Sequence, residues 1–407
     1  MQRFAVVLVV LGLSACATTR EDQGRLGDER AAPRALAMAA PTPATATAET
    51  ARSADAEAFA ATAIRDRGLL DPDTLARVNR KSGEEALMAF EAADARQLSP
   101  RGINELRVHT LPVGAGSCHL LECPGPGNEL LLYDCGSTEA NRARFDLEAV
   151  QQYIGAIAGE RPVKVVISHA DRDLYSHVAA AIAPQRVAEL WLGGQVADYP
   201  LAFRTWVSAV QDAQQQGTGE VAAALPAGWH NDGFAIEQLG CGTALSYVIT
   251  VGVGDEKNDQ SLVLSVDHGS FRVLLTGDAT GETQNVAMQN FPAPLLDSTV
   301  VTAAHHGAQS HGSNDDDWAQ AVRPAIIIYS AGESHAHPRC PVLEAYRATG
   351  ALMAAEQHSL RCGTSLGYEP ARSTFLSEYN TFDSGVIVVT SGAALDELRV
   401  ECWPADC

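Results

Sequence analysis

The chain has 407 residues and a formal net charge of −21, with 29 Lys and Arg against 50 Asp and Glu. Proteins that hold nucleic acids through the phosphate backbone concentrate Lys and Arg on one surface, and this sequence has no cluster of basic residues. The composition therefore argues against a nucleic-acid partner, and we expect a small-molecule or ester substrate instead.

The first residues are typical of an exported bacterial protein. Arg3 precedes an apolar run through Leu13, which is too short to span a membrane. The run ends in Leu13-Ser14-Ala15-Cys16, which resembles a lipobox, so we expect Cys16 to become the lipidated N-terminus. Ala17 is compatible with export to the outer membrane, where the anchor would hold the protein facing the periplasm. The alternative is an ordinary secretory signal cleaved nearby.

Composition divides the rest of the chain. Residues 17–53 are rich in Ala, Thr, Pro and charge, and they hold too little apolar surface to offset the entropy of ordering. Residues 54–97 carry Ala, Leu and Glu, which favour helices. We therefore predict a signal peptide at 1–16, a flexible tether at 17–53, a helical segment at 54–102 and one large α/β domain at 103–407.

Short apolar runs in the last 300 residues predict strands, and the segments between several of them predict helices. Several runs are apolar on both faces, which favours two packed sheets with helices outside. Segments 195–240 and 361–382 are less regular, and as insertions they could cover a pocket and set substrate choice. The predicted strands are 106–111, 130–133, 163–167, 188–192, 246–251, 261–266, 272–275, 300–303, 325–329 and 385–390, and the predicted helices are 147–157, 176–183, 205–215, 282–289 and 341–349.

The segment Ser168–His177 directly follows the predicted strand 163–167 and is rich in metal-binding side chains. His169, Asp171 and Asp173 alternate there, and imidazole and carboxylate groups together are typical ligands of catalytic zinc or manganese. His169 and Asp171 can reach the same ion. Asp173 would bind a second ion and orient the attacking water, or act as general base if only one ion is present.

Further candidate ligands follow later strands. Asp278 comes after a Thr-Gly pair, although an Asp in a turn is the alternative. Of His305 and His306, one would ligate and the other donate a hydrogen bond or bind substrate, and the sequence leaves open which. His337 precedes Pro338 and would be a late ligand or a donor that stabilises an oxyanion. His311 and His335 are secondary candidates, and Arg172 and Arg339 either contact a substrate anion or are solvated charges.

This ordered set of motifs resembles the metallo-β-lactamase-fold hydrolases, in the variant carried by the soluble domain of the competence DNA-uptake protein ComEC. The resemblance runs from about residue 103 to 403 and implies an αββα sandwich in which Asp278 bridges two metals. The matching segments are Val113–Ser117, Leu131–Gly136, His169–Asp173, Asn258–Leu264 with Leu274–Asp278, Ala304–Gly307 and His335–Pro338.

One position departs from the family. The family pattern has Asp-His where this chain has Asp173-Leu174, so an imidazole ligand of the second metal is replaced. His177 lies three residues further, about one helical turn, and could substitute. The sequence therefore leaves open whether the site binds one or two ions of zinc or manganese.

Eight cysteines remain beyond Cys16, an even number that predicts disulfides in an oxidising compartment. Their pairing cannot be deduced from the sequence. The absence of Cys-x-x-Cys spacing argues against a structural cysteine-zinc site.

The leading hypothesis is an envelope-anchored metal-dependent hydrolase of an ester or phosphoester, using a metal-activated water with Asp173 and His337 as catalytic residues. A catalytically degenerate binding module of the envelope is the alternative, supported by Leu174. A third is a secreted nuclease-like phosphodiesterase, suggested by the ComEC resemblance and opposed by the net charge.

Overall fold

The computed structural model describes residues 98–138, 145–215, 229, 239–254, 256–395, 398–404 and 407. The predicted signal peptide with its lipidation site Cys16, the predicted tether and residues 54–97 lie outside the described residues. Residues 98–102, the end of the predicted helical segment, lead into the first strand without forming a helix. No helix in the described part is long and apolar enough to cross a membrane.

The first of two large sheets in the described residues has seven strands, in the order β17-β16-β1-β2-β3-β4-β5. β3, β4 and β5 are parallel to one another, and the remaining pairs are antiparallel. The strands are β1 (Leu106–Thr110), β2 (Cys118–Glu122), β3 (Leu130–Cys135), β4 (Val163–Ile167), β5 (Val187–Leu192), β16 (Gly385–Ser391) and β17 (Arg399–Pro404).

The second large sheet has six described strands, in the order β15-β10-β9-β8-β7-β6, and it is also mixed. Its strands are β6 (Leu245–Val251), β7 (Leu262–His268), β8 (Phe271–Leu275), β9 (Val300–Thr302), β10 (Ile326–Tyr329) and β15 (Glu378–Asn380). Segment 361–382, predicted as an insertion, contributes to two small sheets, β11 (Ala354–Leu360) with β14 (Arg372–Leu376) and β12 (Gly363–Thr364) with β13 (Gly367–Tyr368).

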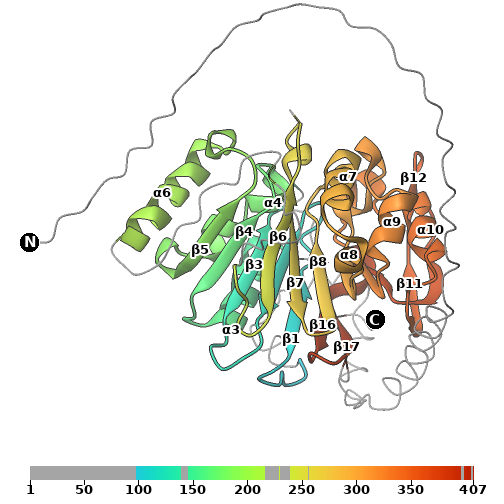
Figure 1. The fold of residues 1–407 in the computed structure, drawn as a ribbon, viewed down its shortest axis with the longest axis horizontal. Helices are drawn as coiled ribbons and strands as arrows, with labels where there is room; N and C mark the ends of the chain where they lie inside the picture. Colours follow the sequence, from blue (N-terminus) through green and yellow to red (C-terminus); the bar gives the residue numbers. More distant parts are fainter. Residues whose placement is uncertain are drawn as a thin grey trace, which may run out of the picture. The chain divides into compact units, whose positions relative to one another are not determined.

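Three apolar layers hold the sheets and helices together. Successive side chains of a strand point to opposite faces, and in β4 Val165 joins a cluster with Ile154 of α3, while Val166 joins one with Leu264 of β7. A third cluster lies between the second sheet and the helices α7, α9 and α10 (Figure 1). The helices are α3 (Leu147–Ala158), α4 (Arg172–Tyr175), α5 (Val178–Ala181), α6 (Leu201–Gln215), α7 (Gly281–Asn290), α8 (Ala293–Leu296), α9 (Asp316–Val322), α10 (Cys340–Ala348) and α11 (Thr381–Ser384).

This helix–sheet–sheet–helix arrangement confirms the predicted αββα sandwich. Each predicted strand overlaps an observed one, but the sequence did not predict β11 to β15 or β17, and it also missed β2. Its residues His119 and Glu122 are polar and nevertheless buried, because the first bonds Thr110 and the second lies in an ion network. The helix predicted at 176–183 is shorter in the structure, where only α5 lies within that range, and a second short helix, α4, precedes it.

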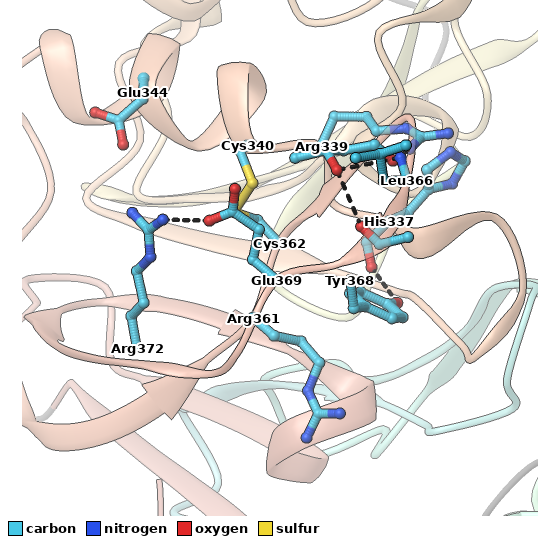
Figure 2. The surroundings of a disulfide bond; sticks show 12 residues. His337, Arg339, Cys340, Glu344, Arg361, Cys362, Leu366, Tyr368, Glu369 and Arg372 are labelled. Carbon is cyan, nitrogen blue, oxygen red and sulfur yellow. Dashed lines mark hydrogen bonds and ion pairs between the residues drawn. A yellow bond between two sulfur atoms is a disulfide. The ribbon is translucent and has the colours of Figure 1, made fainter.

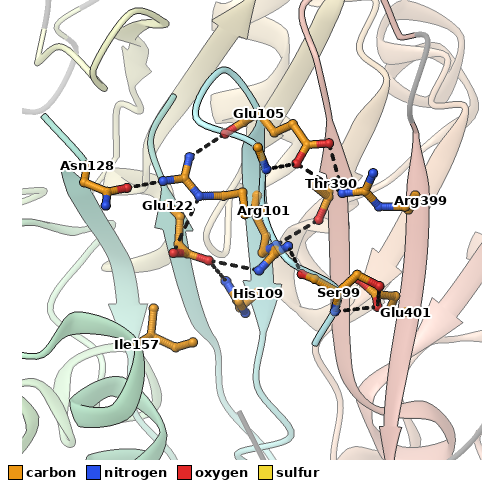
Figure 3. Close-up of polar contacts among 12 residues, drawn as sticks. Ser99, Arg101, Glu105, His109, Glu122, Asn128, Ile157, Thr390, Arg399 and Glu401 are labelled. Atoms are coloured by element: carbon orange, nitrogen blue, oxygen red, sulfur yellow. Dashed lines mark hydrogen bonds and ion pairs between the residues drawn. The ribbon is translucent and has the colours of Figure 1, made fainter. Parts of the chain in front are cut away.

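That ion network lies within the first sheet, around Glu122 (Figure 3). The Glu122 carboxylate lies 3.4 Å from Arg107 and 3.7 Å from Arg101, and it accepts a hydrogen bond from Nε2 of His109 at 3.2 Å. Since a carboxylate only accepts, Nδ1 of a neutral His109 is left to accept from the Tyr153 hydroxyl at 2.8 Å. Burial of Glu122 favours its neutral form, but His109 and the two arginines outweigh this and lower its pKa to about 2.

The predicted disulfides are present in the structure. The eight cysteines form four bonds, Cys118–Cys135, Cys123–Cys241, Cys340–Cys362 and Cys402–Cys407. The first joins residues directly opposite each other on β2 and β3.

Candidate metal centre

The candidate residues gather where strands of both sheets end. Parallel strands place their carboxyl ends at one edge of a sheet, and here β4 leads to His169, β8 to Asp278 and β9 to His305 and His306. The interactions between these residues, described below, show that the two edges meet. A candidate centre thus forms from segments more than 100 residues apart in the sequence.

Three of the predicted ligands lie close enough to hold one ion. One ligand atom from each of Asp173, Asp278 and His306 lies within 4.8 Å of the others. Nε2 of His306 is 3.4 Å from Oδ2 of Asp173 and 3.5 Å from Oδ1 of Asp278. Both this Nε2 and Oδ1 of Asp278 are buried without a hydrogen-bond partner. Buried polar atoms are seldom left unpaired, so the donor set fits a cation such as zinc or manganese.

His306, rather than His305, is turned into this group. Nδ1 of His306 donates to the carbonyl of Ser330 at 3.0 Å, which orients the ring so that Nε2 faces the carboxylates. Burial disfavours a charged imidazole, but the negative charges of Asp278 and Asp173 raise the pKa of His306 to about 9. Both histidines adopt positive φ, 50° for His305 and 59° for His306, a conformation that non-glycine residues seldom adopt.

His305 contacts Asp278 and Asn258. Its Nε2 lies 3.9 Å from Oδ2 of Asp278 and 3.4 Å from the side-chain amide of Asn258. Its ring stacks on His311 with centroids 6.0 Å apart. His305 therefore lies beside the three-residue group as a neighbour of Asp278.

His169 and Asp171 form a second, adjacent pair. Nε2 of His169 is fully buried, has no hydrogen-bond partner and lies 3.6 Å from Oδ2 of Asp171. The other ring nitrogen lies 3.2 Å from the hydroxyl of Ser261. Asp171 also pairs with Lys257 at 3.0 Å, so an ammonium group already neutralises one of its oxygens. The sequence analysis did not identify Lys257, and it included Ser261 only as part of the matching segment Asn258–Leu264.

His337 lies next to His306. The two rings are nearly parallel, with centroids 6.4 Å apart, and His335 stacks on His337 at 5.9 Å. Burial, followed by the charge of His306, lowers the pKa of His337 to about 3. His337 is therefore neutral near pH 7 and offers one N–H donor.

Neither Leu174 nor His177 contributes a ligand atom to the group of Asp173, Asp278 and His306. Leu174 is completely buried, and its N–H donates to the carbonyl of Asp171. His177 is also buried, and its backbone N–H bonds Cys135. Among the described residues, neither belongs to the group that surrounds Asp278 and His306.

Asp134 lies outside the group of Asp173, Asp278 and His306 but supports the loop beside it, a role the sequence analysis missed. Its Oδ1 accepts from the backbone N–H of Ser168 at 2.7 Å, which holds the loop that carries His169. Asp134 is fully buried with φ of 50°, and burial raises its pKa to about 7 despite this hydrogen bond. The available signal was its position in Leu131–Gly136, one of the segments that match the family, where Asp134 lies two residues before Gly136.

Two glycines allow three backbone segments to touch behind Asp173. A Cβ on Gly116 would lie 2.2 Å from the carbonyl oxygen of Gly136 and 2.7 Å from that of Asp173. The N–H of Ser117 donates to the same Asp173 carbonyl at 3.1 Å. The first turn of the domain therefore sets the position of Asp173.

No family model matches the chain. It is 30% identical over 167 residues to ComE operon protein 3 of Bacillus subtilis, a match that covers 37% of this chain and 21% of that protein. It is 27% identical over 228 residues to Recombination protein 2 of Haemophilus influenzae, covering 56% of this chain and 24% of that protein. The matches thus span about a fifth to a quarter of the length of these relatives.

Solved structures are also similar, among them one described as a metallo-β-lactamase fold protein. The Bacillus subtilis protein YhfI has a TM-score of 0.37 and 12% identity, covering 60% of this chain and 93% of YhfI. The metallo hydrolase Igni18 from Ignicoccus hospitalis has a TM-score of 0.36 and 15% identity, covering 60% of this chain and 91% of Igni18. The fold itself follows from the two packed sheets and their outer helices described above.

Proposed function

We propose that this protein, a ComEC-like chain of the metallo-β-lactamase fold, is a metal-dependent hydrolase of an ester or phosphoester. Asp173, Asp278 and His306 would hold one cation, either zinc or manganese. The observation that carries the proposal is that Asp173, Asp278 and His306 converge, while Oδ1 of Asp278 and Nε2 of His306 are buried without a hydrogen-bond partner. A cation would satisfy both atoms and relieve the repulsion between the two carboxylates.

A single strongly held ion fits the geometry better than two. Nε2 of His169 has no hydrogen-bond partner, but the neighbouring Asp171 forms an ion pair with Lys257. Leu174 supplies no ligand atom. A second ion at His169 and Asp171 would have to displace the ammonium group, so we expect it to bind more weakly.

The residues of the centre have separable tasks. A bound divalent cation would supply Lewis acidity that lowers the pKa of water. Asp173, whose side chain is 22% exposed, can accept a proton from a water molecule at the surface of the centre. Neutral His337 can donate its N–H to a substrate oxygen that gains negative charge. Asp134 and Ser330 hold the His169 loop and the His306 ring in place.

Metal stoichiometry tests the proposal directly. Elemental mass spectrometry on the protein purified without chelators should find about one ion per chain. Asp278→Asn should reduce the metal content at least tenfold. The matched control Asp212→Asn, an exposed carboxylate on α6, should keep the ion. Calorimetry in buffers of different ionisation enthalpy should show proton release on binding, because His306 must lose its proton to ligate.

The second candidate is a non-catalytic binding module, favoured by Leu174 and by the ion pair of Lys257 with Asp171. A folded protein that contains no metal and does not bind added zinc or manganese would contradict the hydrolase proposal and favour the binding module. One bound ion without turnover on a panel of carboxylic esters, phosphodiesters and lactones would also favour it.

We also propose that Cys16 anchors the protein to the envelope. The lipobox-like segment Leu13–Cys16 supports this, and four disulfides fit an oxidising compartment. Radioactive palmitate should label the wild type, and Cys16→Ala should lose the label. Equal labelling of both proteins would contradict the anchor.

A further inference from the structure

A pocket of about 410 Å³ borders the candidate metal centre at His337. Its walls come from the loop after His306, the start of α10 and the β12–β13 hairpin. Its volume lies in the range of small-molecule sites. A substrate group that occupies it would therefore extend directly from the reacting centre.

The chemistry of the lining favours an anion. Apart from His337, Arg339 is its one ionisable side chain, and no carboxylate lines it, although the chain carries a net charge of −21. Ser310, Thr364 and Ser365 add hydroxyl groups. Nη1 of Arg339 donates to the carbonyl of Thr364, and within the described part of the chain the guanidinium has no ion pair. Four of its five N–H groups are therefore left for a ligand.

A disulfide bond and several hydrogen bonds restrain the walls of this pocket (Figure 2). The Cys340–Cys362 disulfide joins the residues next to Arg339 and Gly363, and those two residues also form a backbone bridge. The Tyr368 hydroxyl lies 2.6 Å from the carbonyl of His337. A site held in this way loses little entropy when it binds a ligand.

We propose that this pocket binds a carboxylate carried by one arm of the substrate, with Arg339 as the residue that recognises it. The assignment rests on the proposed hydrolase function and names its substrate class as carboxylate-bearing esters. The planar guanidinium matches a carboxylate in fork geometry. A phosphate carries more charge, and no second cation lines the pocket to balance it.

A purely structural role is the competing explanation, because Arg339 also connects α10 to the hairpin through Thr364. Arg339→Gln separates the two roles, since the amide of Gln can still donate to that carbonyl but carries no charge. Arg372→Gln is the matched control. Arg372 is an exposed arginine nearby that pairs with Glu369 and does not line the pocket (Figure 2).

Calorimetry with succinate and its neutral diamide as probes tests the pocket on the full, metal-free chain. Arg339→Gln should weaken succinate binding by about tenfold to 100-fold, as expected for a lost charged hydrogen bond. Arg372→Gln should stay within twofold of wild type, and the diamide should show no dependence on Arg339. No succinate binding by the wild type, or equal binding by Arg339→Gln, would overturn the proposal. If Arg339→Gln unfolds, Arg339→Lys replaces it, with an intermediate loss expected.

Kinetics distinguish failure of the pocket from failure of the hydrolase. With metal bound, 4-nitrophenyl hemisuccinate and 4-nitrophenyl butyrate are compared. Arg339→Gln should raise KM about tenfold or more for the first ester and leave kcat and the second ester within twofold. Equal effects on both esters would overturn the recognition role. If the wild type hydrolyses neither ester, the hydrolase proposal fails on this panel, while the succinate measurement still decides the pocket.

Discussion

Replacing Gly116 with Ala should weaken metal binding without touching any ligand side chain. The new Cβ would lie about 1.2 Å too close to the Gly136 carbonyl and about 0.7 Å too close to that of Asp173, relative to an ordinary 3.4 Å contact. Both obstacles are backbone atoms, so the segment that carries Asp173 must shift. Metal–ligand distances tolerate only about 0.2 Å.

We expect Gly116→Ala to cost about 1–3 kcal/mol of unfolding free energy, as overpacking does, and about tenfold to 100-fold in metal affinity. Urea denaturation and competition with a chromophoric chelator measure the two quantities. Gly155→Ala is the matched control, because a Cβ there meets nothing within 4 Å. As an interior position of α3, it should gain about 0.5–1 kcal/mol and bind metal normally. A folded Gly116→Ala protein with wild-type metal affinity would refute the reasoning.

Two further predictions concern stability. The lowered pKa of Glu122 stabilises the fold above about pH 4.5, and this contribution is lost as the pH falls towards 2. Glu122→Gln should therefore make the unfolding free energy depend less on pH in this acidic range. An unchanged pH dependence would contradict the stabilising role of the ion network. Removing Cys123–Cys241, with a separation of 118 residues, should cost roughly 5 kcal/mol, against roughly 2 for Cys402–Cys407 with a separation of 5. Denaturation of the two double Ser variants measures this order, and a reversed order would contradict it.

The sequence located the candidate site because its motifs are local. A strand followed by polar ligands is visible in any window of ten residues, and Asp173, Asp278 and His306 meet as the resemblance implied. The choice between His305 and His306 was not predictable. It depends on backbone dihedrals and on the Ser330 carbonyl, which lies 24 residues further along the chain.

Features that depend on strand register could not be predicted from the sequence either. Cys118 pairs with Cys135 because β2 and β3 place them opposite each other, and no spacing rule encodes that register. β2 was not predicted because His119 and Glu122 interrupt its apolar pattern. Both are nevertheless buried, because the folded chain brings hydrogen-bond and ion-pair partners to them. The pocket at Arg339 likewise joins α10 to a hairpin whose strands are two residues each.

The strand order of the first sheet has a consequence for biosynthesis. β1 lies between β2 and β16, and Gly385 of β16 comes 275 positions after Thr110. A ribosome that adds about 5–20 residues per second needs roughly 15–55 s to make that stretch. During this time one edge of β1 has no partner strand, and unpaired edges invite association with other chains. The first sheet can therefore close only when the last strands of the chain are available, whether the chain folds during synthesis or after the export proposed above.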